Sequence, residues 1–133
     1  MKATAIIERN ETGLYSIYME TNNLEFGLNG QGKTVDEAKK EFLDAYAEIK
    51  ELLKAEIKDV PELEFEYQYD MASFLDYYSR VLSLAGIERL TGVNQGQLSH
   101  YLTGRSKPSK KTAEKIETSI RSFGQEMSKL EFI

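Results

Sequence analysis

Short stretches rich in β-branched and aromatic residues, separated by residues that favour turns, open the chain and predict strands. Two of them, Lys2 to Arg9 and Leu14 to Glu20, flank Asn10 to Gly13, whose composition is typical of a hairpin turn. Leu24 to Leu28 is expected to form a third strand, and Asn29 to Gly32 a flexible loop. The pattern predicts an antiparallel meander.

A helical period of apolar residues follows the meander. Thr34 and Glu37 have the spacing of a capping box, in which Thr34 accepts the Glu37 N–H and Glu37 reaches back to Thr34. The apolar positions recur at steps of three and four, as on a helix that lies on a sheet; they are Val35, Ala38, Phe42, Ala45, Tyr46, Ile49, Leu52 and Leu53. The opposite face is expected to be solvated and includes Lys39, Lys40, Glu41, Glu48 and Glu51.

Strict alternation begins after Pro61, which ends the helical segment. One face of this stretch carries Leu63, Phe65, Tyr67 and Tyr69, and the other carries Glu62, Glu64, Glu66 and Gln68. Such a stretch predicts a half-buried strand with one acidic face in water. Aligned carboxylates also occur in metal and catalytic clusters, but neither His nor Asp accompanies these. We interpret them as structural, or as an edge on which a basic protein docks.

Helical patterns continue through the rest of the chain, and turns divide it into four helices. The first begins at Met71 or Ser73 and has the apolar residues Phe74, Leu75, Tyr78, Val81 and Leu82. Ser83 is expected to cap the second helix, which runs to Thr91, and Ser109 to cap the fourth. The apolar side of the fourth helix contains Ala113, Ile116, Ile120 and Phe123; Gly124 interrupts it, and Gln125 to Lys129 can continue it. For Leu130 to Ile133, a short strand, a dimer contact and a frayed tail all fit.

The third helix, Gln95 to Leu102, and the turn before it are the most informative stretch. Gly92 can end the preceding helix in the left-handed conformation, Asn94 can cap the new one, and Gly104 can end it. A helix, a tight glycine turn and a second short helix form the helix-turn-helix unit that enters the major groove of DNA. The alternative is an ordinary helical hairpin whose polar face is merely solvated.

Side chains around this turn divide into a packing set and a polar set. The packing set joins the two helices and contains Ile87, Val93, Leu98 and Tyr101. The polar set points away and supplies the candidate base-reading residues Gln95, Gln97, Ser99 and His100. Gln can form two hydrogen bonds with adenine, and Ser can contact a base edge or a phosphate.

Charge is distributed unevenly along the chain. Residues 1–70 contain 8 cations and 16 acids, a net charge of −8, whereas residues 71–133 contain 9 cations and 6 acids, a net charge of +3. Six cations cluster in residues 105–121, namely Arg105, Lys107, Lys110, Lys111, Lys115 and Arg121, against only Glu114 and Glu117. We expect Arg105, Lys107, Lys110 and Lys111 to contact DNA phosphates; a solvated basic helix is the alternative.

Composition excludes several classes of function. The 133 residues, 41% of them hydrophobic and 29% charged, are those of an ordinary globular chain of one or two small domains. Cys is absent, which excludes disulfides, thiolate chemistry and zinc fingers. No apolar run approaches the roughly 18 residues of a membrane span and no signal-peptide pattern is present, so a cytoplasmic protein is expected.

Catalytic motifs are also lacking. His100 is the only His and lies in the proposed reading helix, and Gly27, Gly30 and Gly32 are not followed by the Lys-Ser/Thr of a phosphate loop. A carboxylate group drawn from Glu8, Glu20 and Asp36 is not specified by their spacing. We therefore expect a binding protein, not an enzyme, without a cofactor or a metal.

Taken together, these features resemble a HicB-type antitoxin of a HicA–HicB toxin–antitoxin system. The resemblance rests on the N-terminal strand pair, the Gly-Lys-Thr-Val-Asp-Glu-Ala38 entry to a helix, and a unit similar to the Cro/λ-repressor class. In that unit the matching residues are Gly92-Val-Asn-Gln95, Leu98-Ser-His-Tyr101, Gly104 and Pro108-Ser109. Two departures stand out: Asn22 to Gly27 replaces the usual Pro-Asp-Leu-Pro-Gly, and Glu88 replaces a small residue between the helices.

This resemblance implies an α+β chain with two domains. Residues 1–70 would be an antiparallel sheet with one packed helix, a truncated ribonuclease-H-like fold, which binds a HicA-type mRNA-cleaving toxin. Residues 71–133 would be an all-α helix-turn-helix domain that binds double-stranded operator DNA as a homodimer and represses its own operon. Two rival functions remain: a stand-alone regulator whose α/β domain senses a ligand or dimerises, and a metal-dependent enzyme that uses the ribonuclease-H-like half.

Overall fold

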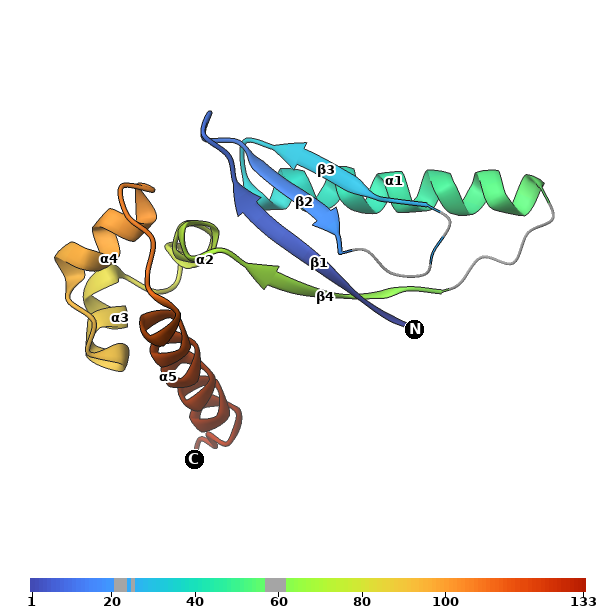
Figure 1. Cartoon of the computed structure of the whole chain (residues 1–133). Helices are drawn as coiled ribbons and strands as arrows, with labels where there is room; N and C mark the ends of the chain where they lie inside the picture. The colour runs from blue at the N-terminus through green and yellow to red at the C-terminus, as the bar shows by residue number, and fades with distance from the viewer. Residues whose placement is uncertain (21–23, 25, 57–61) are drawn as a thin grey trace. The chain divides into compact units, whose positions relative to one another are not determined.

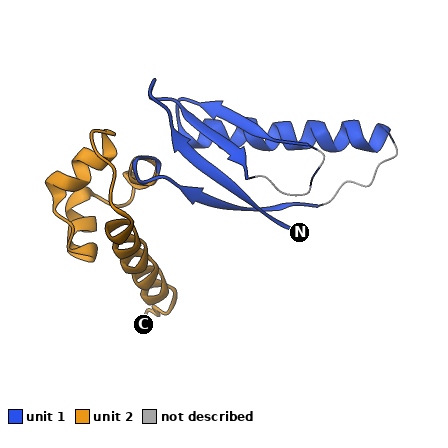
Figure 2. Ribbon diagram, in the orientation of Figure 1, with its two compact units in different colours: residues 1–73 blue, residues 74–133 orange. Residues whose placement is uncertain are grey.

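A computed structural model describes residues 1–20, 24, 26–56 and 62–133. The chain divides into two compact units, residues 1–73 and residues 74–133 (Figure 2). The division falls inside helix α2, Met71–Tyr78, whereas the sequence analysis places it before Met71. Because residues 71–73 are uncharged, unit 1 keeps the net charge of −8 and unit 2 the net charge of +3.

Unit 1 has a sheet of four strands with one long helix on it (Figure 1). Its elements are β1 Lys2–Arg9, β2 Tyr15–Met19, β3 Asn29–Gly32, α1 Val35–Ala55 and β4 Glu64–Tyr69, and the strand order is β3-β2-β1-β4. Strands β1, β2 and β3 pair antiparallel in sequence, but β4 pairs parallel with β1. The chain is α+β as expected, but a purely antiparallel sheet is wrong. The long crossover through α1 permits the parallel pairing, which a hairpin could not make.

The third strand lies at Asn29–Gly32 and not at Leu24 to Leu28, where it was expected (residue 25 lies outside the described residues). Gly30 and Gly32 explain this position, because α1 leaves no room for a Cβ at either of them. A Cβ added to Gly30 would lie 2.5 Å from the Phe42 nitrogen of α1 and 2.6 Å from the Ala38 carbonyl oxygen. The predicted flexible loop is therefore a strand pressed directly against α1, selected by close packing and not by β propensity.

Helix α1 begins as predicted, with one difference at its cap. The Glu37 N–H donates to Thr34 Oγ1 at 3.1 Å, but the Glu37 carboxylate accepts the Lys33 N–H at 2.8 Å in place of the Thr34 N–H. The predicted apolar stripe is buried at Val35, Ala38, Phe42 and Tyr46. Leu52, expected on the same stripe, is 56% exposed because the last turns of α1 run past β2 and β3 (Figure 1).

Strand β4 alternates as predicted, with half-buried aromatic residues toward α1 and exposed residues on the other side. The Phe65 ring lies edge-on to Phe42 and Tyr46, with centroids 4.9 and 5.3 Å apart. The Tyr46 hydroxyl accepts the Leu63 N–H at 2.8 Å. These contacts join the edge strand β4 to the helix that precedes it, and they close the core of unit 1.

Two lysines of α1 reach β4 or the residues just before it. Lys39 was expected on the solvated face, but its ammonium lies 4.4 Å from the centroid of the Tyr67 ring and donates to the Tyr69 hydroxyl at 3.1 Å. Burial raises the pKa of Tyr67. Lys50 contacts Glu62 at 2.9 Å, and this hydrogen-bonded pair raises the pKa of Lys50 and lowers the pKa of Glu62. The long side chains of Lys39 and Lys50 thus cover apolar surface, which the helical period alone predicts to be exposed to solvent.

Unit 2 consists of helices. Together with the part of α2 that it contains, it holds α3 Leu84–Thr91, α4 Gln95–Leu102 and α5 Lys110–Ser128. The predicted caps are confirmed: Ser83 accepts the Gly86 N–H at 3.0 Å and Ser109 accepts the Thr112 N–H at 3.2 Å. The predicted packing set is confirmed as well, since Ile87, Val93, Leu98 and Tyr101 are all buried.

Two predictions for unit 2 are wrong. Val81 is 68% exposed because α2 ends at Tyr78 and leaves it in a turn. Gly124 does not interrupt α5, which continues to Ser128. Of the three alternatives for residues 130–133, the short strand is the one that the structure excludes. None of the described helices is both long and apolar enough to cross a bilayer.

Candidate nucleic-acid interface

The turn between α3 and α4 is built by local hydrogen bonds. Gly92 adopts φ 76°, and its N–H donates to the Glu88 carbonyl at 2.7 Å. The Asn94 side chain accepts the Gly96 N–H at 2.7 Å and the Gln97 N–H at 3.4 Å. Both local predictions, a left-handed glycine end and an asparagine cap, are confirmed. They fix the direction in which α4 leaves the turn.

Thr91 strengthens the same turn and was missed by the sequence analysis. Its buried hydroxyl donates to the Ile87 carbonyl at 2.7 Å and accepts the Val93 N–H at 3.1 Å. One side chain therefore satisfies a carbonyl of α3 and an N–H of the turn. A hydroxyl residue just before a helix-ending glycine was the available signal.

Glu88 provides a second cap for α4. Its Oε1 accepts the Gln95 N–H at 2.7 Å, so the first N–H groups of α4 are shared between Glu88 and Asn94. A carboxylate at a helix N-terminus is favoured by the helix dipole. This contact gives a structural role to Glu88, which stands where the family that the sequence resembles has a small residue. It also places a negative charge beside Gln95.

We expect Asn94→Ala to lower the thermal stability of unit 2. Loss of a cap of this kind typically costs about 1 kcal/mol, and here the Gly96 N–H loses its partner. Glu88 still accepts the Gln95 N–H, so the helix is weakened and not lost. Asn94→Asp keeps the accepting oxygen and serves as the control in thermal unfolding followed by circular dichroism. Equal melting temperatures for Asn94→Ala and the wild type would contradict this role.

The four candidate base-reading residues occupy both flanks of the outward side of α4. Gln95, Gln97 and His100 are exposed and Ser99 is half-buried. With about 100° of rotation per residue, Gln95 and Ser99 share one flank and Gln97 and His100 share the other. Gly96 lies between the flanks, where its missing side chain leaves the backbone open to close approach. No pattern in the sequence marks Gly96 for this role.

Gln97 is also engaged inside the unit. Its amide nitrogen donates to the hydroxyl of the buried Tyr101, one helical turn later, at 2.5 Å. This bond orients the amide along α4 and leaves its oxygen and one N–H available. The spacing of four residues was a signal for such a pair.

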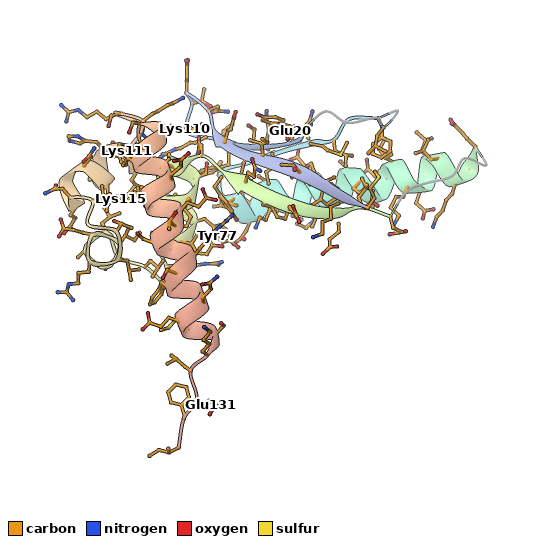
Figure 3. All side chains as sticks on the ribbon, turned by 60° about the horizontal axis from the view of Figure 1, so that its bottom comes forward. Glu20, Tyr77, Lys110, Lys111, Lys115 and Glu131 are labelled. Carbon is orange, nitrogen blue, oxygen red and sulfur yellow. The ribbon has the colours of Figure 1, made fainter. Side chains whose placement is uncertain are left out.

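Cations follow α4 directly, in residues 103–109 and in the first turn of α5. Arg105, Lys107, Lys110 and Lys111 are all exposed, and none of them enters an ion pair with the rest of the described chain. Figure 3 shows Lys110, Lys111 and Lys115 along the beginning of α5. Cations without acidic partners are free to bind phosphate oxygens.

Two further members of the basic cluster behave differently. The Lys115 ammonium lies 3.5 Å from the place that a Cβ on Gly92 would occupy, so Lys115 lies over the α3–α4 turn. Arg121 forms an ion pair with Glu117 at 2.9 Å, which offsets its charge. The candidate phosphate-binding set is therefore centred on the start of α5 and does not extend to Arg121.

Comparison with known protein families, with curated proteins and with solved structures finds no match to this chain. The interface is therefore judged by its own geometry. Its constituents are a turn fixed by Gly92 and Asn94, an outward polar side of α4, and a set of unpaired cations after it. Across the described residues, no group of three or more His, Asp and Glu side chains is placed to hold a metal ion.

Unit 1 offers a second surface, on the side of its sheet that faces away from α1. We call it the open sheet face; it carries Lys2, Thr4, Ile6, Glu8, Ser16, Tyr18, Glu20, Glu64 and Glu66. Lys2 pairs with Glu66 at 3.1 Å. The Tyr18 hydroxyl donates to Glu8 at 3.0 Å, and this hydrogen bond raises the pKa of Tyr18. Carboxylates thus surround an apolar and aromatic centre.

Proposed function

We propose that unit 2 is a helix-turn-helix domain that binds duplex DNA, and that the whole chain is an antitoxin that neutralises a HicA-type toxin. The DNA-binding part rests on one observation. Helix α4, capped at its start by Asn94 and Glu88, presents polar side chains outward and is followed by four cations that have no acidic partner among the described residues. A solvated helical hairpin has no need for cations concentrated at this end.

In this proposal α4 lies in the major groove. Gln95 and Ser99 on one flank, and Gln97 and His100 on the other, face base edges, while Gly96 allows the helix backbone to approach the groove closely. Arg105, Lys107, Lys110 and Lys111 bind phosphates, which position the domain without reading sequence. As a dimer, the chain reads a palindrome whose half-sites lie about one helical turn apart or a multiple of it.

Gln95→Ala is expected to weaken binding to the operator by about 1–3 kcal/mol and to relax the base preference. The side chain of Gln95 is exposed, and its backbone N–H stays bonded to Glu88, so helix α4 keeps its start. The measurement is fluorescence anisotropy with the operator duplex and with a scrambled duplex. Gln125→Ala, an exposed glutamine on α5, is the matched control. Unchanged discrimination by Gln95→Ala would remove Gln95 from the reading set.

The antitoxin part of the proposal is supported by the charge and surface of unit 1. A net charge of −8 and the carboxylates of the open sheet face suit a basic, RNA-binding toxin, because complementary potentials speed association. Neutralisation would follow if unit 1 covers the RNA-binding face of the toxin. The repression of the shared operon by unit 2 would then couple toxin supply to antitoxin supply.

Co-expression with the product of the adjacent small open reading frame tests the antitoxin role. We expect a complex that co-purifies and restores growth, and whose association slows as salt rises. The charge-reversing variant Glu64→Lys with Glu66→Lys should weaken the complex, whereas Glu48→Lys with Glu51→Lys, on the exposed side of α1, should not. If no partner binds while a small ligand alters DNA affinity, the chain is a stand-alone regulator instead.

A further inference from the structure

We propose that the second half of α5 and the residues just after it form a seam through which two copies of the chain associate. The apolar residues along the whole of α5 and just after it recur at alternating steps of three and four, at Ala113, Ile116, Ile120, Phe123, Met127 and Leu130. This is the heptad spacing with which one helix packs along another. The inference deepens the proposed function, because it assigns the dimer to a definite surface.

Within the described part of unit 2, the exposure of this stripe rises toward its distal end. Ile116 is 2% exposed, whereas Met127 is 41% and Leu130 is 53% exposed. Helix α3 packs on α5 and has 8 residues against the 19 of α5. At 1.5 Å per residue these lengths are about 12 and 28 Å. Helix α3 is too short to cover the whole stripe, so the distal part remains uncovered.

Charge favours a second copy of the chain as the occupant of this distal part. The charged residues there are of mixed sign, namely Glu126, Lys129 and Glu131, so two identical surfaces do not repel strongly. This distal part has no cluster of cations to bind a nucleic acid, and no strong excess of one charge to attract a protein of the opposite charge. A two-fold interface requires a patch that complements itself, and a continuous apolar stripe with mixed charges satisfies this condition.

The position of the seam is compatible with DNA binding by the same unit. The lysines lie at the beginning of α5, and Glu131 lies beyond its other end (Figure 3). Association through the distal end therefore leaves Lys110, Lys111 and the outward side of α4 uncovered. Two copies joined in this way would each present one reading helix.

Sedimentation equilibrium of the full chain tests the seam. The wild type should be a dimer, and Met127→Glu with Leu130→Glu should raise the dimer dissociation constant at least 100-fold. Both side chains are largely exposed, so circular dichroism should show unchanged helix content. Val81→Glu is the matched control, since Val81 is 68% exposed in the same unit but lies outside the stripe. A monomeric wild type, or a variant that remains dimeric, would overturn the proposal.

Cross-linking provides a second readout, which the cysteine-free sequence makes unambiguous. Single Met127→Cys and Leu130→Cys variants should form covalent dimers on oxidation, and Val81→Cys should not. Failure of the seam is distinguishable from failure of DNA binding: the Met127→Glu/Leu130→Glu variant should still bind a single half-site duplex with the affinity of the wild-type monomer. Loss of binding to the half-site with an intact dimer would instead contradict the role of α4. If neither seam position cross-links more than Val81→Cys does, the copies do not meet along α5.

Discussion

Gly30→Ala is expected to destabilise unit 1 by about 3 kcal/mol, the upper end of the usual cost of overpacking. A Cβ at this position would lie 2.5 Å from the Phe42 nitrogen and 2.9 Å from its Cα. These are backbone atoms of α1, which cannot rotate away as a flexible side chain can. Either β3 must separate from β2, or α1 must rise from the sheet, and both movements open the core around Ile17 and Phe42.

Amide hydrogen exchange is the appropriate measurement for Gly30→Ala, because it reports on the two units separately. Protection of the α1 and β3 amides should fall by roughly 100-fold, which is the factor for about 3 kcal/mol, while α5 keeps its protection. Gly27→Ala is the control, since nothing lies within 4 Å of a Cβ there. Equal protection in the two alanine variants would show that β3 does not pack on α1 as closely as described.

Removing the four cations that we propose bind phosphates should have the largest effect on DNA binding. Each contact contributes about −0.9 to the slope of the logarithm of affinity against the logarithm of salt concentration. The variant with Arg105, Lys107, Lys110 and Lys111 all changed to alanine should therefore lose about four units of slope, and on the order of 10³-fold in affinity at 0.1 M salt. These side chains are exposed and unpaired in the described chain, so stability should change little.

Arg121→Ala is the matched control for the four cations. It removes a positive charge from the same helix, but the ion pair with Glu117 already offsets that charge. We expect it to change the slope by much less than one unit, with anisotropy measured over a series of salt concentrations. If Arg121→Ala and Lys110→Ala lower the slope equally, the basic helix acts as a diffuse field and not through defined phosphate contacts.

Features decided by neighbouring residues were predictable from the sequence. The ends of α3 and α4, the left-handed Gly92 and the caps at Ser83, Asn94 and Ser109 all depend on one turn of backbone and on the residue that closes it. The alternation of β4 was predictable for the same reason, because the face of each side chain follows from position alone.

Features decided by distant residues were not predictable. The position of β3 depends on how closely α1 approaches Gly30, and the parallel pairing of β4 depends on where the crossover returns to the sheet. Lys39 was judged by its charge and Glu88 by its size, yet the first covers tyrosines of β4 and the second caps α4. In each case the environment of the residue depends on a contact with a different helix or strand of the chain. The local sequence pattern carries no information about that contact.

The exposure of the candidate site residues was predictable from the sequence more than their arrangement on α4, and their role in DNA binding stays a prediction. Gln95, Gln97, Ser99 and His100 do face outward to different degrees, but they occupy two flanks around Gly96, and Gln97 is also bonded to Tyr101. The rotation of about 100° per residue in a helix would have predicted the two flanks of α4. The pairing of Arg121 with Glu117 was not predictable, because it depends on the rotamers that the two side chains adopt.

Selection of bound duplexes from a random-sequence library tests the central claim, that α4 and the cations after it read DNA, without any knowledge of the operator. The full chain should enrich a palindrome with half-sites about 10 base pairs apart or a multiple of this spacing. The variant with Arg105, Lys107, Lys110 and Lys111 changed to alanine should retain almost no DNA, and Gln95→Ala should enrich a degenerate motif. Failure of the wild-type chain to retain or enrich any duplex would contradict the account.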